Sequence, residues 1–79
     1  MKYAVEYTDT FAGEANYSWV KRAVIDAPAD AKAALIMRRA KKAIGISGAR
    51  GRTAEYGEVI EFRPYGYNMV LFVSEHFGD

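Results

Sequence analysis

The chain contains no cysteine, only two prolines and a single histidine among its 79 residues. Without cysteine there can be no disulfide, no thiolate zinc site and no cysteine nucleophile, and this composition is typical of a reducing cytoplasm. His76 lies close to the C-terminus, and no serine has an identifiable base as its partner. Motifs for binding phosphate, a dinucleotide or zinc are also missing. We therefore expect a protein that is not an enzyme and uses no cofactor or metal ion.

Long apolar runs are missing as well. The longest, residues 69–73, is too short to span a bilayer, and residues 1–6 do not contain the apolar core of a signal peptide. A length of 79 residues is that of one domain, residues 1–79, with a small core. We expect a cytoplasmic protein that does not bind a membrane.

Acidic residues are missing from the middle of the chain. The formal net charge is only +1, yet no Asp or Glu occurs between Ala31 and Ala54. This acid-free window contains seven of the eleven basic residues: Lys32, Arg38, Arg39, Lys41, Lys42, Arg50 and Arg52. Such a local excess of positive charge attracts an anionic partner, either a nucleic acid or an acidic protein surface.

Alternating and continuous apolar patterns predict the strands. The predicted strands are residues 2–7, 17–25, 52–56, 58–63 and 69–74. The last is apolar nearly throughout and is therefore expected at the centre of the sheet. Residues 8–16, with Asp9, Gly13 and Asn16, are typical of a loop. In the second strand the buried face is either that of Trp19 and Ile25 or that of Val20 and Val24.

The remaining segment predicts one helix. Asp26 or Ala27 is expected to cap it, with Pro28 in the first turn and Gly45 closing the C-terminus. An apolar stripe follows the helical period: Ala29, Ala33, Ile36, Met37, Ala40 and Ile44. The order is ββαββ or ββαβββ, which predicts an α+β fold in which a four- or five-stranded antiparallel sheet packs against one helix.

Basic and aromatic residues are the candidates for binding a partner. The proposed contact residues are Arg38, Arg39, Lys42, Arg50, Arg52, Tyr65 and Tyr67. Cations at the end of a helix also complement its dipole, so this second reading of the helical residues stays open. Tyr65 and Tyr67 flank a turn glycine and are expected to be exposed, whereas Trp19 and Tyr3 are expected in the core. Asp9 and Glu14 could face a basic partner or a metal ion, but simple solvation is the preferred interpretation.

Three segments resemble a group of small prophage-encoded proteins. They are YTDTFAGEANYSWVKR at residues 7–22, YGEVIEFRP at residues 56–64 and VLFV at residues 70–73. In size, organisation and lack of catalytic residues the chain is similar to anti-CRISPR proteins that inhibit type I CRISPR–Cas surveillance complexes, including those of type I-C. These inhibitors share no common motif, so the resemblance assigns no functional residue.

The resemblance implies a phage-encoded, non-enzymatic inhibitor that binds the host effector complex in the bacterial cytoplasm and blocks binding of target DNA. Some such inhibitors mimic DNA, and here mimicry would require a local acidic cluster such as Glu55, Glu58 and Glu61. The alternative is a small module that binds nucleic acid directly through the basic helix end and the following Gly/Arg loop. Either protein could be a monomer or a homodimer, because a sheet with one covered face has another available for contact.

Overall fold

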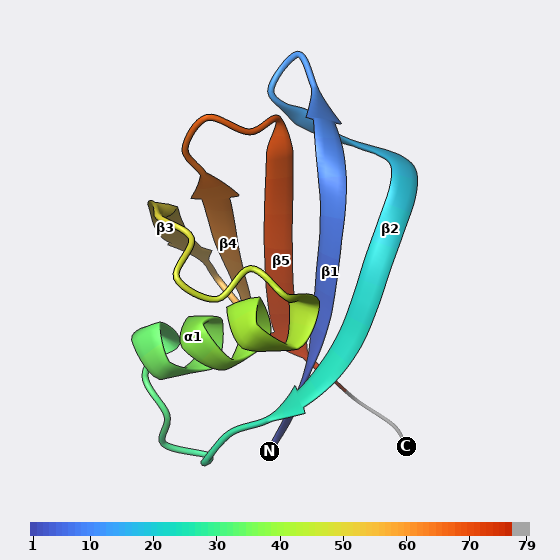
Figure 1. The fold of residues 1–79 in the computed structure, drawn as a ribbon. Coiled ribbons are helices and arrows are strands. Elements are labelled where there is room, and N and C mark those ends of the chain that lie inside the picture. Colours follow the sequence, from blue (N-terminus) through green and yellow to red (C-terminus); the bar gives the residue numbers. More distant parts are fainter. Residues whose placement is uncertain (77–79) are drawn as a thin grey trace.

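A computed structural model describes residues 1–76 and contains one helix and one five-stranded antiparallel sheet (Figure 1). The elements are β1 (Lys2–Phe11), β2 (Glu14–Asp26), α1 (Ala33–Ile44), β3 (Gly51–Tyr56), β4 (Val59–Pro64) and β5 (Met69–Glu75). Across the sheet the strands lie in the order β2-β1-β5-β4-β3. The predicted α+β class is confirmed, and of the two predicted element orders the structure has ββαβββ.

Strand β5 lies at the centre of the sheet, as its apolar sequence predicts. It pairs with β1 on one side and β4 on the other, and Val70, Leu71 and Val73 are each at most 1% exposed. Both faces of β5 are therefore covered over much of its length, since successive side chains point to opposite faces.

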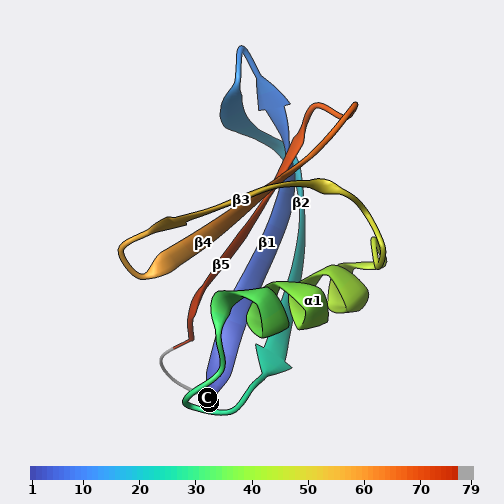
Figure 2. The ribbon, with the colours of Figure 1, turned by 90° about the vertical axis from the view of Figure 1, so that its left-hand side faces the viewer.

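Helix α1 covers one face of the sheet, as the view turned by 90° shows (Figure 2). The predicted stripe supplies its buried residues Ile36, Met37, Ala40 and Ile44. From the sheet, the core includes Val5, Tyr7, Ile25, Phe62, Leu71 and Val73. On β2 the covered face is thus the one that contains Ile25, whereas Val24 is 55% exposed on the other face.

The helix begins later than the sequence predicts. Its N-cap is Lys32, which makes no side-chain capping bond, and its first turn contains no acidic residue. Residues 27–32 instead form a connection tied to the N-terminus, because Ala27 N–H donates to the Met1 carbonyl and the Met1 amino group donates to the Ala27 carbonyl. At the other end the prediction is confirmed, since Gly45 closes the helix with a φ of 91° in the left-handed region.

The prediction of a loop at residues 8–16 is wrong. Strands β1 and β2 continue into this segment and meet at a tight turn, where Ala12 and Gly13 both have positive φ. A register shift between Thr8 and Thr10 interrupts the pairing, and Tyr17, with a φ of 57°, donates its N–H to the Thr8 hydroxyl there. Such a bulge bends a hairpin.

The bend brings the tip of the β1–β2 hairpin towards β4. Arg63 donates from Nη1 to the Gly13 carbonyl at 2.7 Å, and this contact lies on the sheet face opposite the helix. Thr8 and Val70, on that same face, are completely buried. This face of the sheet is therefore covered at the end near the β1–β2 turn. It is exposed at the opposite end, around Val24.

Candidate protein-binding surface

Three of the proposed contact residues lie on the outer side of α1. Arg38, Arg39 and Lys42 are exposed, and the opposite side of the helix packs its apolar stripe against the sheet. The two ion pairs among residues 1–76 join Arg22 to Glu6 and Arg63 to Glu61, so neither involves these three cations. Lys42 lies in the last turn, where it also complements the helix dipole, but Arg38 and Arg39 precede that turn.

Other cations of the chain bind backbone carbonyls. Lys41 Nζ donates to the Ala49 carbonyl at 3.1 Å and lies 4.7 Å from the centre of the Phe62 ring. Lys21 Nζ donates to the Ile44 carbonyl at 2.7 Å, and so satisfies one of the unpaired acceptors at the C-terminus of α1. Charged donors of this kind make strong hydrogen bonds.

These contacts divide the basic residues into structural and outward-facing ones. Arg39 belongs to both groups, because it is exposed and its Nη1 donates to the Asp26 carbonyl at 2.8 Å. The role of Lys21 was not predicted, because 23 positions separate it from its acceptor in the sequence. No local pattern could have revealed a contact between β2 and the end of the helix.

Arg52 lies on the other side of the sheet from the helix cations. Arg52 is the cross-strand partner of Arg63 in the β3–β4 pairing. It therefore lies on the same face of the sheet as Arg63 and Glu61. The helix covers the other face, to which Phe62 and Leu71 belong. The basic window is therefore not one continuous surface.

Tyr65, Tyr67 and Arg50 come together at the end of the molecule where β4 turns into β5. Both tyrosines are 68% exposed, as predicted for turn residues. Tyr65 N–H donates to the Arg50 carbonyl at 3.0 Å, which places this turn beside the loop that follows α1. These three proposed contact residues are thus neighbours in space although up to 17 positions separate them.

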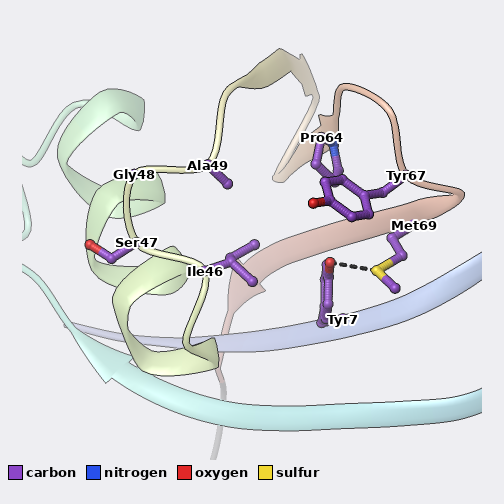
Figure 3. Close-up of a pocket in the computed structure, with 8 residues that line it drawn as sticks. All are labelled: Tyr7, Ile46, Ser47, Gly48, Ala49, Pro64, Tyr67 and Met69. Carbon is purple, nitrogen blue, oxygen red and sulfur yellow. Dashed lines mark hydrogen bonds between the residues drawn. The ribbon is translucent and has the colours of Figure 1, made fainter.

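A pocket of about 590 Å³ opens between that loop and the β4–β5 turn (Figure 3). It is lined by Tyr7, Ile46, Ser47, Gly48, Ala49, Pro64, Tyr67 and Met69. Tyr67 thus lines the pocket, whereas Tyr65 of the same turn does not. This pocket was not predicted from the sequence, because its walls come from three separate segments of the chain.

Tyr7 lies on β1 at the pocket and is only 8% exposed. Its hydroxyl donates to Met69 Sδ at 2.6 Å, and its ring makes an edge-to-face contact with Trp19 at 5.6 Å between centroids. Burial, and secondarily the nearby Tyr67, raises the pKa of the Tyr7 hydroxyl. Trp19 itself is 41% exposed, so the prediction that it lies in the core is wrong.

Asp9 is held by its neighbours on β2. Its carboxylate accepts hydrogen bonds from the Ser18 hydroxyl at 2.5 Å, from Asn16 Nδ2 at 3.1 Å and from the Ser18 N–H at 3.2 Å. These bonds, that of the Ser18 hydroxyl first, lower the pKa of Asp9. The carboxylate thus joins the two strands of the bent hairpin, and within residues 1–76 no group of three potential metal-ligating side chains forms.

The three glutamates considered for DNA mimicry do not share a face. Glu55 lies on the helix side of β3, Glu58 lies in the β3–β4 turn and Glu61 lies on the opposite side of the sheet. Glu61 Oε1 also accepts a 2.8 Å hydrogen bond from Arg63 Nε, which compensates its charge.

Comparisons with known proteins add no further assignment: no family model, curated protein or solved structure matches the chain. In the part of the chain that the structure describes, no helix is long and apolar enough to cross a membrane.

Proposed function

We propose that this protein is a non-enzymatic inhibitor of a host type I CRISPR–Cas surveillance complex, and that it blocks the binding of target DNA. The observation that carries the proposal is the exposed basic side of α1, with Arg38, Arg39 and Lys42, together with the exposure of Arg50, Tyr65 and Tyr67 where β4 turns into β5. Arginine and tyrosine are enriched at protein interfaces and dominate their binding energy.

The charge of this surface favours occlusion over DNA mimicry. A DNA mimic presents carboxylates on one face, and here Glu55, Glu58 and Glu61 are distributed over different sides of the hairpin. The basic surface instead complements an acidic protein surface, to which arginine can form paired hydrogen bonds. Bound there, the protein would obstruct the path of the DNA sterically.

A gel-shift titration of labelled target DNA with a purified type I-C complex tests the proposal. We expect the complex–DNA band to disappear when this protein is added and no shift when the protein is mixed with DNA alone. Arg38→Glu should weaken the inhibition at least tenfold, because it reverses an exposed charge of the basic surface. Lys2→Glu, an equal charge change at an exposed site on β1, is the matched control. A complex–DNA band that persists at excess protein contradicts the proposal.

The second candidate, a module that binds nucleic acid directly, is supported by the acid-free window alone. The cations of this window are divided between the two sides of the sheet, because Arg52 lies on the face that α1 does not cover. Fewer of them can therefore contact one nucleic acid. A shift of the DNA by the protein alone, weakening steeply with salt, would favour this candidate.

A further inference from the structure

The pocket beside the β4–β5 turn has an apolar lining with few polar groups. Besides backbone atoms, its lining residues offer only three hydroxyls, those of Tyr7, Ser47 and Tyr67. That of Tyr7 already donates to Met69 Sδ. Figure 3 shows Tyr67 on one side of the opening and Ile46 on the other, with Tyr7 below them. A volume of about 590 Å³ lies within the usual range of binding pockets and can hold a large side chain.

Positive charge borders this pocket. Lys41 Nζ binds the carbonyl of the lining residue Ala49, and Arg50 follows Ala49 directly. Lys21 is the cross-strand partner of Tyr7, and its Nζ binds the Ile44 carbonyl just before the lining loop. Asp9, the register partner of the lining residue Met69, is one carboxylate against these three cations, and it accepts hydrogen bonds from Ser18 and Asn16.

We infer that this pocket receives an aromatic or large aliphatic side chain from an acidic segment of a partner protein. The apolar lining would bury the side chain, and the bordering cations would attract the carboxylates that flank it. A nucleobase fits less well, because its polar edges would remain unsatisfied against this lining. The inference rests on the proposed function, because the pocket would be the anchor site for the partner that this protein inhibits.

Titration of the ¹⁵N-labelled protein with short peptides tests the inference without the CRISPR–Cas complex. The probe is a blocked pentapeptide with a central phenylalanine between two pairs of glutamates. We expect saturable shifts of the Gly48 and Ala49 amide signals, with a dissociation constant of about 1 mM or tighter. A peptide with alanine at the centre, and one with lysines in place of the glutamates, should bind at least tenfold more weakly.

Tyr67→Ala and Tyr65→Ala form a matched pair for the same titration. Both side chains are 68% exposed in one turn, so neither substitution should impair folding, but only Tyr67 lines the pocket. We expect Tyr67→Ala to weaken peptide binding at least fivefold and Tyr65→Ala to leave it unchanged.

The inference is overturned if the glutamate peptide causes no shifts at the pocket, if both tyrosine variants behave alike, or if a thymidine tetranucleotide binds there more tightly than the peptide. Its failure is distinguishable from failure of the proposed function. Inhibition of the complex without peptide binding would refute the pocket alone, whereas peptide binding without inhibition would refute the CRISPR–Cas assignment alone.

Discussion

Replacement of Lys41 by methionine should destabilise the protein, although lysine at a helix end is usually dispensable. Its ammonium group donates to the Ala49 carbonyl at 3.1 Å and lies 4.7 Å from the centre of the buried Phe62 ring. Methionine retains most of the apolar stem and removes the charge. The change therefore isolates the contribution of the ammonium group.

The expected loss follows from the two contacts. A hydrogen bond to a charged group contributes about 1.5–3 kcal/mol, and a cation–π contact at a partly exposed site contributes about 0.5–1 kcal/mol. Because one ammonium group makes both contacts, the two contributions are not additive, and we expect a loss of about 2 kcal/mol in the free energy of unfolding. For a domain of this size that corresponds to a fall in the thermal midpoint of about 8–16 °C.

Lys42→Met is the matched control, since Lys42 is the adjacent residue in the same last turn and is exposed. Thermal unfolding followed by circular dichroism should show its midpoint within about 4 °C of the wild type, because exposed substitutions usually change stability by less than about 0.5 kcal/mol. Equal midpoints for the two variants would refute the division of the basic residues into structural and outward-facing ones.

Three further predictions concern single side chains. Leu71→Ala, at a completely buried site in the central strand, should cost about 2–5 kcal/mol in urea unfolding, and a loss below about 1 kcal/mol would contradict the core described above. Asp9→Asn should destabilise the protein at neutral pH, because the pKa of Asp9 is lowered in the folded state. This stabilisation is present above the ordinary value of 3.8 and is lost as the pH falls through the folded pKa, so wild type and variant should converge in acid. Tyr7 has a raised pKa, so the wild type should lose stability relative to Tyr7→Phe as the pH rises above 10, and parallel alkaline profiles would contradict its burial.

Much of the architecture is predictable from periodicity. The continuous apolar run of β5 places it at the centre of the sheet, and the stripe of Ile36, Met37, Ala40 and Ile44 gives the buried side of α1. Gly45 ends the helix because the left-handed conformation suits glycine. These features follow from the local sequence alone.

The errors in the fold arise where distant parts of the chain compete with local preferences. Pro28 and the nearby aspartates favour a helix start, but backbone bonds between Ala27 and Met1 hold that segment in another conformation. Similarly, Asp9 and Asn16 are typical loop residues, yet here their side chains bind each other across two paired strands. The composition of residues 8–16 therefore did not indicate that the β1–β2 hairpin continues through them.

The sequence names the residues of the proposed binding surface but does not give their arrangement. The sequence identified exposed Tyr65 and Tyr67, but it could not indicate that only Tyr67 lines a pocket. Nor could it indicate that Arg52 lies on the other side of the sheet from Arg38, because this depends on the register of β3 with β4.

The proposed function requires that this protein binds a type I CRISPR–Cas complex through the basic side of α1. The most direct test is a calorimetric titration of the purified type I-C complex with wild-type protein and with Arg38→Glu. We predict saturable binding of the wild type at a fixed stoichiometry, with a dissociation constant of about 1 μM or tighter, and binding at least tenfold weaker for the variant. Absence of binding by a folded wild-type protein would contradict the proposed partner, and equal affinities would contradict the proposed surface.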